Sequence, residues 1–350
     1  MLLGYLPGTL ICLEGKLRIR LVGHQGEPVM ATGQSGPWYE FVELLKSKGC
    51  KILDTPYGEK IDLLIANSHS DKALKEARES KLDGNKIHLV LWEPPIIDHR
   101  RHSPKTLKLY GLVWSPSIYW AKSAKTLYFK WPQLLLEYRN SRFSEWLQKE
   151  NKAVMVLANK FSATKGELYT LRRKLGVITS HTSTMDLYGD KWNLGKFYSF
   201  RHYLGNLVRT PFNQISLKSW FYLGKNQDSY KGLSLDKVKT CEKYRIIVVV
   251  ENSMSYISEK FFDAFASRSI VIYVGPKLSE FGIPNECAIQ VEPDAMKINK
   301  KIIELMELNP ENQFNIMKEQ QLKISTISHE WYCITVLKKL AQDIYSESTK

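Results

Sequence analysis

The chain has 350 residues, of which 43% are hydrophobic and 25% are charged. This composition is typical of a folded globular protein and excludes a disordered, fibrous or membrane-embedded chain. Its distinctive quantity is the charge, because 50 Lys and Arg residues against 36 Asp and Glu residues give a net charge of +14. Such an excess predicts an anionic partner without saying which one.

The spacing of the cysteines and the first apolar stretch indicate in which kind of cellular compartment the protein is expected. The five cysteines lie far apart and form no CxxC or Cys/His cluster, so neither a zinc site nor a disulfide framework is expected, and a reducing compartment is the simplest interpretation. The opening stretch MLLGYLPGTLIC has no basic residues before its apolar part and is interrupted by Gly4 and Pro7. A membrane span needs roughly 20 residues. We therefore expect no signal peptide and no transmembrane anchor.

The first half of the chain alternates short apolar runs with stretches of helical period. Strands are expected at residues 17–23, 50–54, 61–67 and 87–92, and helices at 37–49 and 71–80. The run IHLVLW stops at Pro94 and Pro95, because proline cannot pair inside a sheet. Residues 96–150 are rich in Trp, Tyr and basic residues and show no clear pattern before the helix-like run FSEWLQKENK.

The second half repeats this alternation. Strands are expected at residues 153–160, 185–189, 245–252, 269–275 and 287–292, and helices at 165–176, 236–244, 258–269, 294–309 and 329–345. Residues 190–235 show no clean period and predict a loop-rich connection. Parallel strands joined through helices make right-handed crossovers, the building block of doubly wound α/β domains.

Two such series predict two Rossmann-like α/β domains that face each other across a cleft. We expect an N-terminal domain over residues 1–150, a C-terminal domain over 151–325, and a C-terminal helix over 326–350 that packs back on the N-terminal domain. A single doubly wound domain with large insertions is the alternative that this pattern leaves open.

Ligands of open α/β sheets bind beyond the carboxyl ends of the strands, so the stretch ENSMSYISEK after the strand at 245–252 is the first candidate site. Ser258 can cap the following helix, and the free N–H groups of its first turn attract anions. Glu259 could hold ribose hydroxyls and Lys260 a phosphate. An ordinary helix start with a solvated lysine explains the same residues, because acidic side chains are favoured at helix N-termini.

The longer stretch ENSMSYISEKFFDAFASRSIVIYVGP resembles the signature of the α1,3/4-fucosyltransferase family, in which ENS, a Tyr, an S/T-E-K triplet, an apolar helix and a V-x-Y-x-G strand follow in this order. The flanking stretches YKGLSLDKVKTCEKYRII and GIPNECAIQVE are also similar to this family. The resemblance implies two Rossmann-like domains in the GT-B arrangement, GDP-fucose bound by the C-terminal domain and an acceptor sugar met by the N-terminal one. It further implies inversion at the anomeric carbon, with no obligatory metal or cofactor.

The resemblance assigns donor-site roles by position. Asn252 and Tyr256 would contact the donor, Glu259 the ribose or fucose hydroxyls, and Lys260 the diphosphate. The family has a proline where this chain has Val271, and an aromatic residue before its EN pair where this chain has valines.

The stretch LANKFSATKGELYTLRRKLG is similar to the family's S-N-x(5)-R-x(3)-[FY]-x-x-L, which implies a donor-site role for Asn159. The family's phosphate-binding arginine falls on Lys165, which keeps the charge but loses the planar fork that grips two phosphate oxygens. Arg172 and Arg173, further along the expected helix, are the alternatives for this contact.

An inverting transfer needs a carboxylate that takes the proton of the acceptor hydroxyl. Glu93 is the best candidate, because it follows an apolar strand and precedes two prolines that fix the turn into the cleft. Burial there would raise its pKa toward that of a working base. The resemblance implies the same role, since LVLWEPP is similar to the family's base-bearing element. The alternative is that Glu93 has a structural role only and forms an ion pair with Arg100 or Arg101.

Asp98 is the second candidate base, and His88 and His99 are candidates for acceptor contact, although a lone histidine is more often structural. No acceptor-binding residue is assigned. The aromatic and basic residues between 110 and 131 fit sugar stacking or a core equally well, and no nucleic-acid-binding motif is present, so a nucleic acid partner is not expected.

The expected partners are GDP-fucose and an acceptor glycan. The positive charge that Lys260 and Lys165 leave unassigned favours an anionic membrane surface or an anionic glycan over DNA as a further partner, and a merely solvated surface is the alternative that stays open. We therefore expect a cytoplasmic protein, peripheral on the inner membrane face, with a lipid-linked acceptor. The alternative functions are a GT-B glycosyltransferase with another nucleotide sugar and a non-catalytic protein that binds a nucleotide or polyanion.

Overall fold

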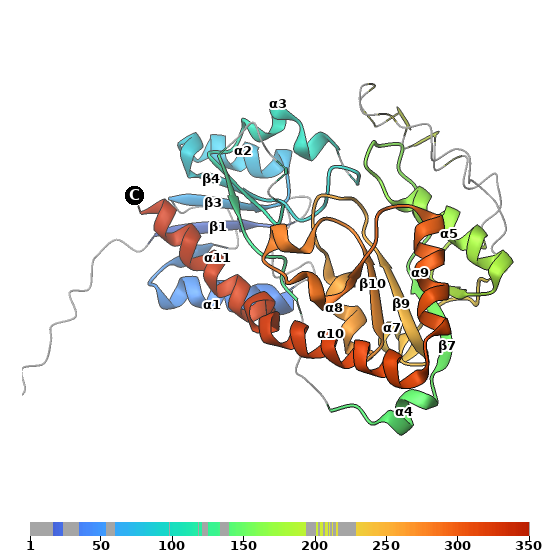
Figure 1. Cartoon of the computed structure of the whole chain (residues 1–350). Coiled ribbons are helices and arrows are strands. Elements are labelled where there is room, and N and C mark those ends of the chain that lie inside the picture. The colour runs from blue at the N-terminus through green and yellow to red at the C-terminus, as the bar shows by residue number, and fades with distance from the viewer. Residues whose placement is uncertain are drawn as a thin grey trace, which may run out of the picture.

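The computed structural model describes residues 17–23, 35–53, 60–97, 99–117, 119–120, 125–133, 140–193 and 229–349, with single positions between 201 and 215. In these residues, six strands form an N-terminal sheet and five form a C-terminal sheet (Figure 1). The same residues contain no helix that is long and apolar enough to cross a membrane.

The N-terminal sheet has the order β2-β1-β3-β4-β5-β6, and all its neighbouring strands are parallel. Its strands are β1 (Arg18–Val22), β2 (Lys51–Leu53), β3 (Leu63–Asn67), β4 (Ile87–Val90), β5 (Leu112–Ser115) and β6 (Thr126–Tyr128). The accompanying helices are α1 (Ser35–Ser47), α2 (Asp71–Glu79), η3 (Gly84–Lys86), η4 (His99–His102) and α3 (Pro104–Leu107). Parallel pairing follows from the helical crossovers between the strands.

Alternate residues of these strands pack into two different helical layers, as the period of a strand requires. Leu21 and Ile65 pack on the side of α1, and Leu64 and Ala66 pack on the side of α2. The layer beside α1 also contains α11 (Cys333–Ser348), which contributes Val336, Leu337, Leu340, Ala341 and Ile344 to this core. The C-terminal end of the chain therefore completes the N-terminal domain (Figure 1).

The C-terminal sheet has the order β11-β10-β9-β7-β8 and is also parallel. Its strands are β7 (Glu150–Val156), β8 (Met185–Tyr188), β9 (Tyr244–Val250), β10 (Ile270–Val274) and β11 (Ile289–Gln290). The helices of this part are α4 (Phe143–Leu147), α5 (Tyr169–Thr182), α7 (Lys237–Cys241), α8 (Glu259–Ala266), η7 (Leu278–Phe281), η8 (Asn285–Cys287), α9 (Ala295–Glu307) and α10 (Pro310–Trp331).

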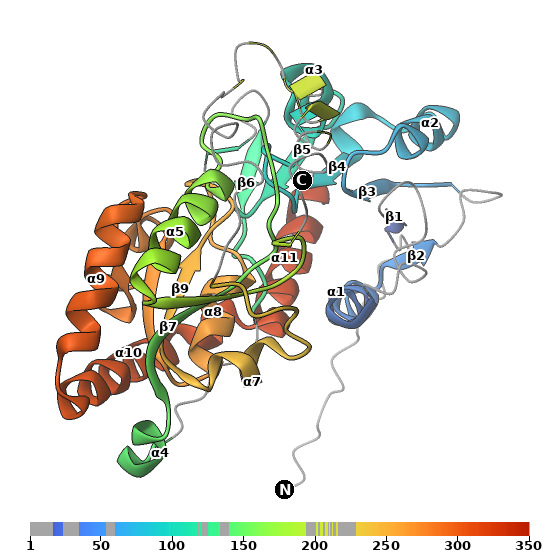
Figure 2. The same cartoon turned by 90° about the vertical axis from the view of Figure 1, so that its right-hand side faces the viewer.

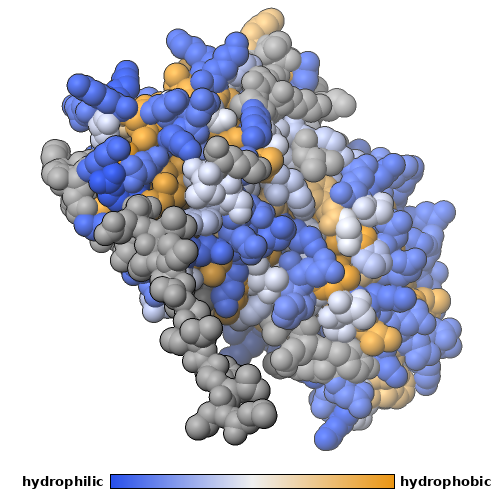
Figure 3. Space-filling model, turned by 90° about the vertical axis from the view of Figure 1, so that its left-hand side faces the viewer, coloured by the Kyte–Doolittle hydropathy of each residue, from blue (hydrophilic) through white to orange (hydrophobic). Residues whose placement is uncertain are grey.

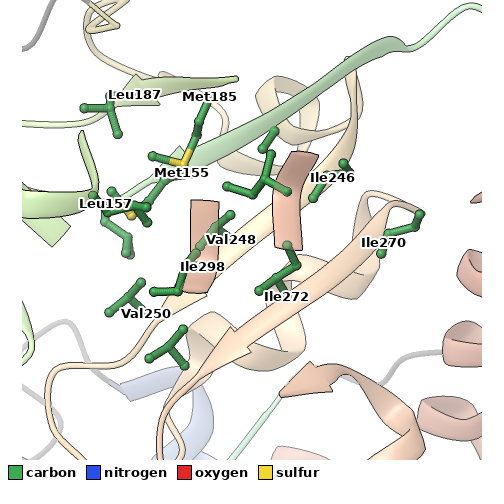
Figure 4. Packing of buried hydrophobic residues seen from close by; sticks show 14 of the residues in the cluster. Met155, Leu157, Met185, Leu187, Ile246, Val248, Val250, Ile270, Ile272 and Ile298 are labelled. Carbon is green, nitrogen blue, oxygen red and sulfur yellow. The ribbon is translucent and has the colours of Figure 1, made fainter. Parts of the chain in front are cut away.

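Both faces of this sheet are covered by helices, which explains why β9 is buried throughout and apolar from Ile246 to Val250. Val248 and Ile272 lie in the cluster that includes α5 and α9 residues (Figure 4). Val249 and Val271 lie in the cluster on the other face, with α8 and α10. Figure 2 shows α5 and α9 together on one side of the sheet.

Two predicted helices end or break at places that the sequence pattern does not indicate. The run at 143–152 forms a helix only to Leu147, because the residues from Glu150 onward already belong to β7, which pairs with β9. The final helix is interrupted at Tyr332, where Gln133 accepts from Cys333 N (2.8 Å) and donates its own N–H to Trp331 O (2.8 Å). Most of the expected loop region at 190–235 lies outside the described residues.

The buried side chain of His88 makes the stability of the folded protein depend on pH. Its side chain lies in the middle of the N-terminal sheet and is 1% exposed. Burial, assisted by the positive charge of Lys86, lowers the pKa of His88 to about 4. Because an unfolded histidine has a pKa near 6.5, the unfolded state binds more protons between about pH 6.5 and pH 4. We expect the free energy of unfolding to fall by about 3 kcal/mol across this window as the pH drops.

Urea denaturation of the parent and of His88→Leu at pH 7 and at acidic pH measures this effect. The variant is expected to lose less stability on acidification than the parent does. His181→Gln is the matched control, because His181 is exposed near the end of α5. Equal acid sensitivity in the parent and in His88→Leu would contradict the assignment.

Candidate functional site

A cavity of about 280 Å³ lies between the two sheets, at the carboxyl ends of their strands. The residues that line it from the N-terminal domain and the connection after it are Glu93, Ile97 and Trp131. The polar residues that line it from the C-terminal domain are Lys160, Arg172, Lys237, Asn252, Tyr256, Glu259 and Lys260. Four of the predicted donor-site residues and the predicted base therefore border one space. This is the position at which α/β sheets bind ligands.

Asn252 is held in place from two sides. Arg172 donates from Nη2 to Asn252 Oδ1 (2.9 Å) and to Val250 O (2.6 Å), and Asn252 Nδ2 donates to Tyr256 Oη (2.8 Å). The Arg172 guanidinium lies 4.9 Å from the centre of the Tyr169 ring, and burial lowers its pKa. Arg172 Nε has no partner among the described residues, so a buried N–H donor is left beside the cavity wall.

A buried carboxylate organises the start of α8. Glu251 is fully buried and accepts from Ser258 N (2.9 Å) and Ser258 Oγ (2.7 Å). Lys260 Nζ donates to Ser258 Oγ (2.9 Å) and to Glu259 (3.2 Å), and lies 4.0 Å from Glu251. Burial raises the pKa of Glu251, against the opposing effects of Lys260 and Ser258. The ammonium of Lys260 is thus fixed at the N-terminus of a helix, where anions bind.

The loop that carries Tyr256 is contacted by two aromatic residues, Trp120 between β5 and β6 and Trp131 after β6. The Tyr256 ring is buried, with its centre 5.2 Å from that of Trp120 and 5.7 Å from that of Trp131. Trp120 Nε1 donates to Ser255 Oγ (2.9 Å), and Ser117 Oγ donates to Ser255 O. These contacts fix the floor of the cavity relative to both domains.

Glu93 lies where the sequence predicts it, after β4 and beside the cavity, but its environment differs. Its side chain is exposed, so the expected burial of this carboxylate is wrong. The strand ends at Val90, and the residues after it lead Glu93 out of the sheet before Pro94 packs inward. His102 Nε2 hydrogen-bonds with Glu93 O (2.8 Å), which holds the backbone of this turn.

Lys165 is not part of the cavity lining. It lies on an exposed turn with Gly166, whose φ is +82°, before α5 begins at Tyr169. The physical reason is the register of this segment, because Arg172 lies one turn inside the helix and Lys160 precedes the turn. These two residues, and not Lys165, bring positive charge to the cavity from this side.

Asn159 and Arg173 support the cavity wall from behind. Asn159 is buried after β7 and donates from Nδ2 to Lys191 O (3.1 Å), and its Oδ1 has no partner among the described residues. Arg173 donates to Lys160 O (2.7 Å) and lies over the Phe161 ring. Neither residue lines the cavity itself.

The remaining candidates do not enter this site. Asp98 lies outside the described residues, as does the side chain of His99. His88 is buried inside the N-terminal sheet, away from the cavity lining. Over the described ranges, no three His, Cys, Asp or Glu side chains are grouped so that they could hold a metal ion.

Sequence reasoning gave no role to Glu251, Lys160 or Lys237, and it left Trp131 open between sugar stacking and the core. Glu251 has a signal that could have found it, because a charged residue directly after the apolar run from Ile246 to Val250 needs a buried partner. Lys160 and Lys237 have no such signal, since both lie in polar surroundings in the sequence and only the fold brings them together.

Charge is divided between the two walls of the cavity. The C-terminal wall carries four cationic residues, Lys160, Arg172, Lys237 and Lys260, together with the carboxylate of Glu259, and Lys237 is paired with Asp263 (2.9 Å). The opposite wall carries the exposed carboxylate of Glu93. Such a site can bind an anionic group on one side and accept a proton on the other.

No protein-family model and no curated protein matches the sequence. Solved structures share its fold. Anabaena Alr3699/HepE in complex with UDP is 12% identical, with a TM-score of 0.55 over 94% of this chain and 100% of that one. Sucrose-phosphate synthase from Thermosynechococcus elongatus is 11% identical, with a TM-score of 0.53 over 95% and 100%. A glycosyltransferase from Rickettsia africae ESF-5 is 12% identical, with a TM-score of 0.51 over 96% and 99%.

These similarities extend over both α/β parts, and at this level of identity they concern the fold. The parallel sheets and their arrangement agree with the sequence prediction of two Rossmann-like domains facing across a cleft. The chain has the two-domain GT-B fold.

Proposed function

We propose that the protein is an inverting glycosyltransferase that moves L-fucose from GDP-β-L-fucose to a hydroxyl of an acceptor glycan, in an α1,3-type linkage. The observation that carries this proposal is the cavity, where Glu93 of the N-terminal domain lies opposite the cations of the C-terminal domain. The resemblance of the stretch at 251–276 to the fucosyltransferase signature supports the donor. The UDP and UDP-glucose complexes of Anabaena Alr3699/HepE support a nucleotide sugar as the ligand class.

The C-terminal wall is the donor side in this proposal. Lys260 meets the diphosphate from the N-terminus of α8, and we assign the second diphosphate contact to Arg172, in place of Lys165. The place of Arg172 in the cavity lining, where Lys165 is absent, supports this assignment. Asn252 and Tyr256 contact the donor from the floor of the cavity.

Glu259 is the proposed hydrogen-bond acceptor for the hydroxyl groups of the donor's ribose or fucose. Its side chain is half exposed and borders the cavity. Partial burial raises the pKa of Glu259. The positive charge of Lys260 and a hydrogen bond from a backbone N–H group lower this pKa by more, so the pKa of Glu259 lies below its usual range. An ionised carboxylate accepts hydrogen bonds from hydroxyls strongly. Asn159, whose Oδ1 has no partner among the residues that the structure describes, lies behind the wall and is the proposed supporting residue.

The chemical step needs both walls. The acceptor oxygen forms a bond to the anomeric carbon as the bond from that carbon to the phosphate oxygen breaks, and the leaving GDP carries away the electron pair. Glu93 takes the proton of the attacking hydroxyl. Lys260 and Arg172 stabilise the negative charge that develops on GDP. The attack comes from the face opposite the diphosphate, which converts the β-linked donor into an α-linked product.

A UDP-sugar is the second candidate donor. The UDP-glucose complex of Anabaena Alr3699/HepE supports a UDP-sugar as the alternative donor in this fold. A non-catalytic protein that only binds a nucleotide or polyanion is the alternative outside enzymes.

The experiment that tests the proposal supplies a library of acceptor glycans together with GDP-fucose, GDP-mannose or UDP-glucose. Nucleotide release and the product are then measured, and NMR gives the anomeric configuration. We expect GDP release only with an acceptor, and an α-fucoside as the product. Transfer from UDP-glucose alone would favour the second donor, and nucleotide binding without transfer from any donor would favour the binding protein.

A further inference from the structure

Glu251 is a charged residue to which the proposed mechanism gives no part. Charged side chains normally lie at the surface of a protein, and Figure 3 shows a face that hydrophilic residues largely cover. Glu251 is instead fully buried directly after β9, and its backbone N–H donates to Val274 O (2.9 Å) at the end of β10. Burying a carboxylate is costly unless hydrogen bonds compensate. The hydrogen-bond partners of Glu251 therefore indicate its role.

Both partners of the Glu251 carboxylate belong to Ser258. Oε1 of Glu251 accepts from Ser258 N (2.9 Å), and Oε2 accepts from Ser258 Oγ (2.7 Å). Two donors thus face the two oxygens, and only an ionised carboxylate offers an acceptor at both positions. A glutamine would turn an NH₂ group toward one of these donors. The arrangement therefore requires a glutamate and not merely a polar residue of the same size.

The Ser258 hydroxyl passes this constraint on to Lys260. A hydroxyl has one hydrogen to donate and two lone pairs that accept. Lys260 N (3.4 Å) and Lys260 Nζ (2.9 Å) both donate to Ser258 Oγ, and neither group can accept. Because these two donors use both lone pairs, the hydrogen of the hydroxyl is left for Glu251. Glu251 therefore orients the hydroxyl that receives the Lys260 ammonium.

The ammonium of Lys260 is held with one N–H group left over. One of its three N–H groups donates to Ser258 Oγ and a second to Glu259 (3.2 Å). The third has no hydrogen-bond partner in the described part of the chain, and Lys260 lines the cavity. Glu251 lies 4.0 Å from the ammonium, beyond hydrogen-bonding distance, so it acts on the ammonium through the hydroxyl of Ser258. A lysine fixed in this way does not have to be ordered when an anion binds.

Gly275 provides the space that the Glu251 side chain occupies. A Cβ atom on Gly275 would lie 2.8 Å from Glu251 Cγ and would overlap the hydroxyl of Tyr273. Tyr273 is itself fully buried, so neither neighbour can move aside into solvent. The side chain of Glu251 is therefore packed against a backbone that only glycine allows, with its carboxylate directed at Ser258.

We infer that Glu251 is a positioning residue for the diphosphate site. By orienting the hydroxyl of Ser258, it holds the ammonium of Lys260 where the diphosphate of the donor binds. The inference rests on the proposed function, in which Lys260 meets a diphosphate. Glu251 does not line the cavity, so its effect reaches the ligand only through Lys260.

Calorimetric titration of the full chain with GDP, and in parallel with UDP, measures this role without requiring transfer. We expect Glu251→Gln to bind the nucleotide about tenfold more weakly, because the Lys260 side chain then has to be ordered when the ligand binds. Ser258→Ala removes the hydroxyl and should weaken binding by a similar factor, and it carries the test if Glu251→Gln does not fold. Ser258→Thr keeps a hydroxyl and should bind more tightly than Ser258→Ala.

A double-mutant cycle shows whether Glu251 acts through Lys260. In a Lys260→Ala background the ammonium is already absent, so adding Glu251→Gln should weaken binding by less than about twofold. Residues that share one interaction are non-additive in this way. A general loss of structure predicts instead that the two factors multiply.

Glu76→Gln and Ser70→Ala are the matched controls. Glu76 is a buried carboxylate of α2 that pairs with Arg20 (2.9 Å), and Ser70 caps the same helix. Both controls should lose thermal stability and keep the nucleotide affinity of the parent, since neither residue lines the cavity. Thermal unfolding checks that every variant is folded.

Full nucleotide affinity in the folded Glu251→Gln and Ser258→Ala variants, or factors that multiply in the cycle, would overturn the inference alone. A parent protein that binds neither GDP nor UDP would overturn it together with the proposed function. Nucleotide binding that follows the expected cycle in a protein that transfers no sugar would support the positioning role and contradict the proposed transfer.

Discussion

Glu93→Gln is expected to lower the rate of sugar transfer about 10²–10⁴-fold, the usual contribution of a positioned general base. The amide keeps the shape of the side chain and cannot take the proton of the acceptor hydroxyl. Nucleotide affinity should not change, because Glu93 borders the cavity opposite the cations that would hold the diphosphate. Single-turnover transfer and nucleotide titration measure the two quantities separately.

Glu79→Gln is the control for this experiment. Glu79 lies at the end of α2 in the same domain, its side chain is 65% exposed, and it is absent from the cavity lining. The control should transfer sugar at the rate of the parent. If Glu93→Gln also kept full activity, the base would have to be another group, and Asp98 would be the next residue to substitute.

Lys260→Ala is expected to lower kcat/KM about 10²–10³-fold, the range found when one group that stabilises developing negative charge is removed. The Lys260 side chain is 14% exposed, and its ammonium lies at the N-terminus of α8, where it is oriented by hydrogen bonds to Ser258 and Glu259. Both donor binding and the departure of GDP use this charge, so donor affinity and the rate of transfer should fall together.

Two further variants separate this effect from loss of structure. Removing Lys260 leaves the buried Glu251 with Ser258 as its partner in the cluster, so Lys260→Arg, which restores a cation, should recover part of the activity. Lys239→Ala removes an exposed lysine of α7 and should have no effect. Unaltered donor affinity and rate in Lys260→Ala would exclude the diphosphate role.

The fold was predictable because its strands are continuous apolar runs. Every residue of β9 is buried. The residues from Asn252 to Lys260 come soon after this strand in the chain, so their position at its carboxyl end follows from the sequence order alone. Local order also placed Glu93 beside the cavity, one short turn after β4. Sites that lie directly after a strand end can therefore be found from the sequence.

Residues that depend on the exact start of a helix or on long-range packing could not be placed in this way. The turn before α5 places Lys165 outside the cavity and Arg172 in its lining. Which of the two faces the cavity depends on the residue at which α5 begins, and the helical period of the sequence does not determine that residue. The exposure of Glu93 depends on how Pro94 packs. The break at Tyr332 depends on Gln133, about 200 residues away in the sequence.

The central claim is that the cavity binds a GDP-linked sugar. Thermal unfolding of the parent protein during titration with GDP, GDP-fucose, GDP-mannose, UDP and UDP-glucose tests it most directly. A ligand at about 100 times its Kd stabilises the folded state by about 2.7 kcal/mol. We predict that GDP-fucose raises Tm more than any UDP compound does at the same concentration. No change in Tm with any GDP compound would contradict the account.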